Sequence, residues 1–143
     1  LCLEAIDWQE VDLIIGIEAM GLPLTAPLSI NSGKPLVVVR KRQYGLEGEV
    51  TIDQSTGYSK GEMYLNDIKS GERVVIIDDV LSTGGTIRAI IDGIEKTGAQ
   101  IMHVITVVEK GPGLEKLQQE YPNIKIESLV RLEMDGANIV ILE

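Results

Sequence analysis

The stretch VVIIDDVLSTGGT, residues Val74 to Thr86, decides the fold of this 143-residue chain. Its four leading apolar residues predict a buried strand, and two adjacent carboxylates, Asp78 and Asp79, follow where that strand ends. The small, hydroxyl-rich run from Ser82 to Thr86 then opens a segment with isoleucines at helical spacing. A strand that turns into a helix in this way is typical of an open α/β sheet, in which ligands bind beyond the carboxyl ends of the strands.

The rest of the chain repeats this alternation of apolar runs and helical segments, which predicts a mostly parallel central sheet flanked by helices. Strands are expected at residues 11–17, 35–40, 73–78, 101–108, 126–132 and 138–142, with a weaker edge strand at 61–65. Helices are expected at residues 21–32, 83–97 and 114–121. Pro27 is expected to break or shift the first of these helices. No repeat or linker divides the sequence, so residues 1–143 are expected to form one domain.

The composition excludes several classes of protein. The net charge of −9 argues against a protein that holds nucleic acid by bulk charge. No apolar run is long enough to cross a membrane, and a single cysteine allows neither an intramolecular disulfide nor a cysteine-built metal site. The chain opens without a signal peptide, which favours the cytoplasm. It begins on a leucine inside a helix-like stretch, so native residues are expected to precede it.

The turn at residues 82–86 has the properties of a phosphate-binding site. Its glycines let the backbone approach a ligand closely, and the free N–H groups of the following helix start, together with the hydroxyls, can hold an anion. A sugar phosphate fits, with Asp78 and Asp79 on vicinal ribose hydroxyls. The alternative is an ordinary helix cap, which would leave two acids at a buried strand end without a partner. Neither the Walker pattern GxxxxGK[ST] nor GxGxxG occurs in the chain.

These residues resemble the signature of the type I phosphoribosyltransferases: an apolar strand, two acids, two apolar residues, a variable position and TGGT. The resemblance implies that Asp78 and Asp79 contact the ribose hydroxyls of 5-phosphoribosyl-1-pyrophosphate (PRPP). The 5-phosphate would be held by Ser82, Thr83, Gly84, Gly85 and Thr86. The family fold adds a mobile lid and a small hood over the base, which is incomplete if residues are missing upstream. Mg²⁺ is expected to bind mainly through PRPP, with no metal site built by the protein alone.

The segment IGIEAMG, Ile15 to Gly21, lies where this family has its pyrophosphate-binding loop. The resemblance makes the Glu18–Ala19 bond a candidate for a non-proline cis peptide. The residues expected to bind pyrophosphate are Glu18, Ala19, Met20, Gly21, Arg40 and Lys41. Met20 departs from the adenine enzymes, which usually have an arginine at this position. An ordinary strand-to-helix turn is the alternative reading of this segment.

A basic and polar segment follows the second predicted strand. RKRQYGLEGEV, Arg40 to Val50, puts three cations in a row in an acidic protein, either as a solvated surface or to neutralise pyrophosphate. The resemblance favours Lys41 for the second role. Residues 41–60 show little periodicity and are expected to form a flexible loop. Their similarity to the family's lid implies closure over the reaction, with Tyr44 and Tyr58 as candidates for lid contacts.

The catalytic and base-binding residues are less well defined. Lys41 is the catalytic cation that the resemblance suggests, and Glu49 and Glu62 are the candidates for a general acid or base. Some 6-oxopurine enzymes have an aspartate at the position of Ser82, and adenine enzymes have a glutamate near Gly57. This chain has neither, so chemistry is expected to rest on positioning and charge stabilisation.

Two further polar residues have competing interpretations. Lys110, after the strand at 101–108, is the candidate donor to a purine 6-oxygen, or a solvated loop lysine. His103 lies in an apolar strand and is expected to be a core residue rather than a ligand.

The four motifs together are most similar to the archaeal hypoxanthine or adenine phosphoribosyltransferase branch. The function this implies is a Mg-dependent purine phosphoribosyltransferase of purine salvage, with hypoxanthine as preferred base and guanine second. Adenine or orotate as the acceptor, and a PRPP-sensing regulator without catalysis, are the alternatives. A homodimer is expected from the same resemblance, with no nucleic-acid or membrane partner.

Overall fold

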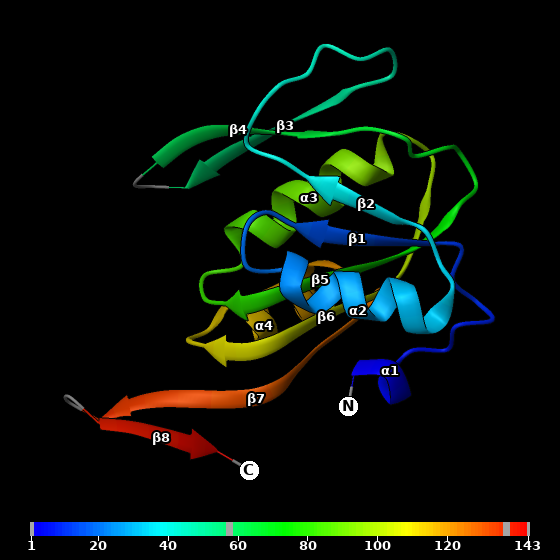
Figure 1. The fold of residues 1–143 in the computed structure, drawn as a ribbon. Coiled ribbons are helices and arrows are strands. Elements are labelled where there is room, and N and C mark those ends of the chain that lie inside the picture. Colours follow the sequence, from blue (N-terminus) through cyan, green and yellow to red (C-terminus); the bar gives the residue numbers. More distant parts are fainter. Residues whose placement is uncertain (1, 57–58, 136–137, 143) are drawn as a thin grey trace.

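The computed structural model describes residues 2–56, 59–135 and 138–142. In chain order the elements are α1 (Cys2–Ala5), β1 (Leu13–Ile17), α2 (Leu22–Ser32), β2 (Leu36–Val39), β3 (Val50–Thr56), β4 (Ser59–Leu65), β5 (Arg73–Leu81), α3 (Gly85–Glu95), β6 (Gln100–Lys110), α4 (Gly113–Glu120), β7 (Lys125–Asp135) and β8 (Asn138–Leu142). Within the described residues, six strands form one sheet in the order β2-β1-β5-β6-β7-β8, and β3 and β4 form a separate pair (Figure 1). The α/β architecture with a mostly parallel sheet is therefore confirmed, and only β8 pairs antiparallel within that sheet.

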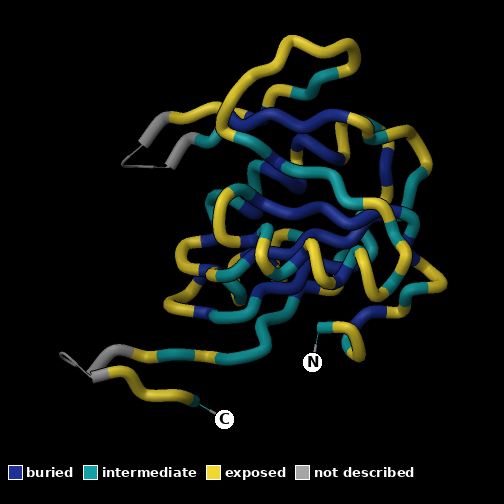
Figure 2. The backbone as a smooth tube through the Cα atoms, in the orientation of Figure 1, coloured by how far each residue is buried: buried dark blue, intermediate teal, exposed yellow. Residues whose placement is uncertain are grey.

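Apolar runs form the central strands because both faces of the sheet are covered. All of β1 is buried, and so are residues 74–78 of β5. Alternate residues of these strands face opposite layers. Ile14 and Val75 pack on the side of α1 and α2, whereas Ile15 and Ile76 pack on the side of α3 and α4 (Figures 1 and 2).

The helices agree with their predicted positions to within a few residues. α3 buries Ile87, Ile90, Ile91 and Ile94, the stripe that its spacing predicted. The expectation that Pro27 breaks or shifts the first helix is wrong, because α2 continues through it to Ser32. Pro27 lies in the second turn, where its missing N–H removes a single hydrogen bond to the turn before it. Among the described residues, no helix is long and apolar enough to cross a membrane.

The segment expected to be a flexible loop, residues 41–60, is a loop only in part. Residues 41–48 are exposed and irregular, but β3 begins at Val50 and pairs antiparallel with β4 (Figure 2). Ile52 of β3 is 2% exposed and lies against Gly93 of α3, where an added β carbon would be 2.7 Å from Ile52 Cγ1. Hydrophobic contact with α3 therefore orders half of the segment. Gly57 and Tyr58 lie outside the described residues.

Candidate active site

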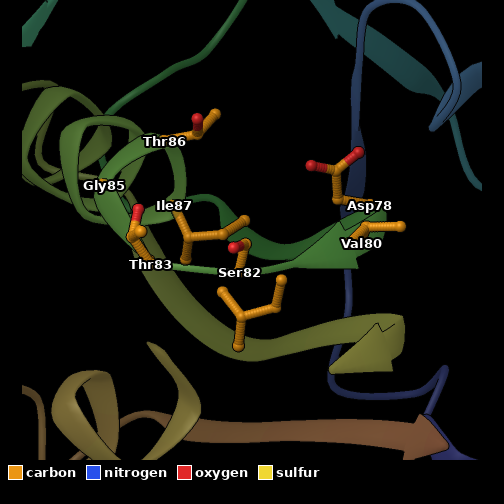
Figure 3. Close-up of a pocket in the computed structure, with 9 residues that line it drawn as sticks. Asp78, Val80, Ser82, Thr83, Gly85, Thr86 and Ile87 are labelled. Carbon is orange, nitrogen blue, oxygen red and sulfur yellow. The ribbon is translucent and has the colours of Figure 1, made fainter. Parts of the chain in front are cut away.

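Two adjoining pockets lie beyond the carboxyl ends of β1 and β5. The smaller, of about 100 Å³, is lined by Asp78 and by the run from Val80 to Ile87. Figure 3 shows Asp78 on β5 and Thr86 in the first turn of α3 on opposite sides of it. The larger, of about 220 Å³, is lined by Ile17, Glu18, Ala19, Met20, Lys41, Gln54, Met63, Asp78, Asp79 and Thr86. Asp78 and Thr86 line both pockets, so one elongated ligand can occupy the two together.

The turn at residues 82–86 is shaped by close packing on α4. Gly84 has φ 85°, a left-handed conformation that favours glycine, and no side chain caps the helix that begins at Gly85. A β carbon on Gly113, the first residue of α4, would lie 2.8 Å from the nitrogen of Gly84 and would overlap the carbonyl oxygen of Ser82. Packing on α4 thus holds the turn in place, and the first N–H groups of α3, which have no acceptor within the helix, can bind an anion.

The two acids differ in their surroundings. Asp78 is 8% exposed, and its pKa is raised to about 7, first because burial disfavours its charge and further because Asp79 is adjacent. Asp79 is half-buried at the edge of the larger pocket. β5 extends past both acids to Leu81, so the predicted strand end at Asp78 is too early. A ligand that brings hydroxyl donors or a cation to this pair would favour the charged form of Asp78.

The loop after β1 closes the other end of the larger pocket. The Glu18–Ala19 peptide is cis, as expected. A β carbon on Gly21 would lie 3.1 Å from Asp78 Oδ1, so the glycine lets this loop approach the acids. The backbone N–H of Lys41 donates to Glu18 Oε2 at 2.9 Å, which brings the start of the basic segment to the loop. Glu18, Ala19, Met20 and Lys41 thus line one wall.

The side chains of Arg40 and Glu49 contact each other and not the two pockets. The Arg40 guanidinium donates to Asn66 Oδ1, lies 3.5 Å from Glu49 Oε2 and stacks 3.8 Å from the centre of the Tyr44 ring. Glu49 also accepts the N–H groups of Tyr44 and Gly45, each at 3.1 Å. These contacts make the pair a brace for the 41–49 segment, and neither residue lines the two pockets.

The remaining predicted residues also lie away from the two pockets. Glu62 accepts a hydrogen bond from the Tyr64 hydroxyl, and Lys110 is exposed at the end of β6. His103 is 5% exposed and its pKa is lowered by burial, which confirms it as a core residue. Neither pocket lining includes Glu62 or Lys110. Within the described part of the chain, no cluster of three or more His, Cys, Asp or Glu could hold a metal.

Two residues without a clear sequence signal shape this site: Gln54 lines the larger pocket, and Gly113 packs against the turn at residues 82–86. Gln54 lines the larger pocket and donates to Thr86 Oγ1 at 2.5 Å. The alternation of Val50, Ile52 and Gln54 carried the signal for a strand, but it is short and polar residues surround it. Nothing in the sequence near Gly113 indicates that α4 begins against the turn at residues 82–86, because that contact depends on the fold.

Comparison with known proteins places the chain in a family. Residues 2–139 match the model of the phosphoribosyl transferase domain. The hypoxanthine/guanine phosphoribosyltransferase of Methanohalobium evestigatum is 47% identical over 135 residues, which are 94% of this chain and 70% of the relative. That of Ferroglobus placidus is 50% identical over 133 residues, 92% of this chain and 70% of the relative. The adenine phosphoribosyltransferase structure from Thermoanaerobacter pseudethanolicus superposes with a TM-score of 0.79 at 30% identity, covering 91% of this chain and 76% of that one. A family match over nearly the whole chain, on a fold whose acids and TGGT turn line one site, shows that this chain belongs to the phosphoribosyl transferase domain family.

Proposed function

We propose that this protein is a purine phosphoribosyltransferase that transfers the phosphoribosyl group of PRPP to hypoxanthine or guanine, releasing pyrophosphate and a nucleoside 5′-monophosphate. The observation that carries the proposal is the pair of adjoining pockets that share Asp78 and Thr86. One pocket has the donors for a terminal phosphate and the other has a cation and a loop for a pyrophosphate. Asp78 lines both pockets and Asp79 lines the larger one, so a ribose that joins the two ends of the ligand would meet both acids.

Each part of PRPP has a match in this arrangement. The 5-phosphate binds the turn at 82–86, and the ribose hydroxyls donate to Asp78 and Asp79. Pyrophosphate binds the loop at 18–21 with the charge of Lys41. The bond from ribose C1 to pyrophosphate breaks, pyrophosphate leaves with the electron pair, and a purine ring nitrogen bonds to C1 and loses its proton to water or to the departing pyrophosphate. Lys41 stabilises the leaving charge, and residues 41–49 are the proposed mobile part of the lid.

Asp78 and Asp79 fit a magnesium ion that PRPP brings with it. Mg²⁺ takes oxygen ligands, and it is commonly held by one or two carboxylates together with substrate phosphates rather than by a protein cage. Burial raises the pKa of Asp78, and a nearby cation would favour the charged form of this carboxylate. When bound, the ion neutralises charge on the leaving pyrophosphate.

The choice of a 6-oxopurine is supported by the relatives that are 46–50% identical, which are named hypoxanthine/guanine phosphoribosyltransferases. Lys110 remains the proposed donor to the 6-oxygen. Adenine is the second candidate, because the structures that superpose include adenine enzymes. Glu49 and Glu62 are engaged in hydrogen bonds of their own, so we propose no general acid or base.

The proposal includes a homodimer and a cytoplasmic location, both supported by the family resemblance. Exposed apolar side chains near the pyrophosphate loop support a partner surface there: Met20 is 62% exposed, Tyr44 56% and Leu46 52%. Light scattering at assay concentration should give twice the chain mass.

The test is pyrophosphate release from PRPP and Mg²⁺ with hypoxanthine, guanine, adenine, xanthine or orotate as acceptor. We expect the highest kcat/KM for hypoxanthine. The matched control is an Asp78→Asn/Asp79→Asn variant, which should be inactive. A tenfold preference for adenine would make the protein an adenine enzyme. PRPP binding without turnover of any base would instead favour the non-catalytic regulator.

A further inference from the structure

A hydrogen bond joins the β3–β4 hairpin to the turn that carries the phosphate donors. Gln54 Nε2 donates to Thr86 Oγ1 at 2.5 Å, across 32 positions of sequence. Both side chains line the larger pocket with Asp78 and Lys41. Gln54 is therefore in reach of a ligand and in contact with one of its expected donors.

The packing of β3 along α3 produces this contact. Ile52 and Gln54 are two residues apart, so they lie on the same face of the strand. Gly93 and Thr86 are seven residues apart, which puts them on the same face of the helix, two turns from each other. Ile52 packs closely on Gly93, and this docking aligns Gln54 with Thr86.

The direction of the hydrogen bond decides what the threonine can do. A hydroxyl has one proton to donate and two lone pairs that accept. Because the amide N–H donates to Thr86 Oγ1, the hydroxyl proton must point elsewhere, and the residue faces both pockets. The amide oxygen of Gln54 lies on the other side, 3.9 Å from the position of a β carbon on Gly61. A hydroxyl that accepts one hydrogen bond is also a stronger donor in the next.

We propose that Gln54 is a positioning residue that aims the hydroxyl proton of Thr86 at the 5-phosphate of the substrate. This inference rests on the proposed function, which puts a phosphate at residues 82–86. It adds that phosphate affinity depends on the docked hairpin, because Gln54 reaches Thr86 only while β3 lies on α3. Pyrophosphate is proposed to bind the loop at 18–21 and Lys41 in the larger pocket, so its affinity should not depend on the orientation of the Thr86 hydroxyl.

The first experiment is a calorimetric titration of the whole chain with ribose 5-phosphate and, separately, with pyrophosphate and Mg²⁺. Gln54→Met keeps the length of the side chain and removes its donor, and we expect ribose 5-phosphate to bind about tenfold more weakly. Gln54→Glu offers only acceptors to Thr86 and should weaken ribose 5-phosphate binding further. Pyrophosphate affinity should stay unchanged in Gln54→Met, whereas the added charge of Gln54→Glu lies in the pocket with Lys41 and should weaken pyrophosphate binding too. Gln119→Met, the same substitution at an exposed position of α4, is the control.

A double-mutant cycle separates positioning from direct contact. In the Thr86→Val background the hydroxyl is gone, so adding Gln54→Met should cause no further loss of ribose 5-phosphate affinity. In the Thr86→Ser background, which keeps the hydroxyl, the tenfold effect should return. Full loss in both backgrounds would mean that Gln54 binds the ligand itself and would overturn the proposal.

Two other outcomes overturn it as well. Unchanged ribose 5-phosphate affinity in Gln54→Met would show that Thr86 needs no orientation. Equal weakening of ribose 5-phosphate and pyrophosphate binding in Gln54→Met would show a general displacement of the hairpin. If the unsubstituted protein binds neither PRPP nor ribose 5-phosphate, the proposed function itself fails, and that result is distinct from the other two.

Discussion

Gly113 at the start of α4 lies directly beneath the backbone of Gly84, so that a β carbon on Gly113 would be 2.8 Å from the Gly84 nitrogen. Gly84 is the left-handed residue from which the first turn of α3 begins. The first residue of α4 therefore packs against the backbone of the proposed phosphate site and fixes its shape, although α4 does not line the pocket.

Gly113→Ala should therefore disturb the phosphate turn. The added methyl group would overlap backbone atoms of Ser82 and Gly84, which cannot move as freely as a side chain. We expect the free energy of unfolding to fall by about 1–3 kcal/mol and PRPP affinity to fall about tenfold. Urea denaturation and calorimetry would measure the two effects. Lys116→Ala, exposed on the same helix, is the control, and equal behaviour of the two variants would contradict the prediction.

Gly93→Ala should destabilise the protein, although alanine in a helix interior is normally favoured over glycine by about 1 kcal/mol. The reason is the 2.7 Å approach of Ile52 Cγ1 to the position of the new β carbon. Ile52→Ala alone should cost about 2–5 kcal/mol, and it should cost clearly less in the Gly93→Ala background, because the clash is then removed. Chemical denaturation of the four proteins gives the coupling. Ile139→Ala, at a site 63% exposed, should change stability by about 0.5 kcal/mol or less.

Asp78→Asn should strengthen the fold at pH 8 and weaken substrate binding. The pKa of Asp78 is raised to about 7 in the folded state, above the usual value of 3.8. The folded protein therefore holds a proton that the unfolded chain has lost between about pH 4 and pH 7, so this group's contribution to stability falls as pH rises through that window. The amide removes the dependence, and we expect about 1–3 kcal/mol of added stability at pH 8.

The same Asp78→Asn variant should bind PRPP roughly ten- to a hundred-fold more weakly, because a charged hydrogen-bond acceptor is lost. Denaturation at pH 5 and pH 8 tests the first effect and calorimetry the second. Asp53→Asn, exposed on β3, should show neither effect. A pH dependence of stability identical to that of the unsubstituted protein would show that Asp78 titrates normally.

Arg40 and Lys41 should respond differently to removal of charge. Arg40→Met takes the cation from Glu49, whose side chain is 6% exposed, so we expect a loss of about 1–3 kcal/mol in stability and little change in pyrophosphate affinity. Lys41→Met should leave stability unchanged and weaken pyrophosphate binding about tenfold. Thermal unfolding and calorimetry on both variants provide the comparison. A strong loss of pyrophosphate affinity in Arg40→Met would contradict this prediction and show that Arg40 contributes to pyrophosphate binding.

Limited proteolysis should locate the mobile part of the lid. Trypsin should cut first after Lys41 or Arg42, which lie in the exposed 41–48 segment, and PRPP with Mg²⁺ and a nucleotide analogue should slow the cut. β3 has no lysine or arginine, so a protease of broad specificity such as proteinase K is needed to probe it, and β3 should resist that enzyme because Ile52 is buried against α3. Equal cleavage rates with and without ligands would contradict closure of a lid at these residues.

The central strands, the amphipathic α3 and the position of two acids next to the TGGT turn could all be predicted from the sequence. These features are local, because an apolar run, a helical repeat of isoleucines and a glycine turn can each be recognised within about a dozen residues. The family resemblance added the loop at 18–21 and its cis peptide, which the structure has. Asp78 and Thr86 share a pocket because the strand runs directly into the turn.

Which polar residues reach the site depends on long-range packing. The sequence makes Arg40 a candidate for pyrophosphate binding and Glu49 a candidate general acid or base, and only the fold shows that their side chains form an ion pair with each other. Gln54 reaches Thr86 from 32 residues away because Ile52 packs on Gly93. The periodicity of a strand or a helix indicates which of its faces is buried but not which other segment that face contacts. The contact between Gln54 and Thr86 therefore could not be predicted from the sequence.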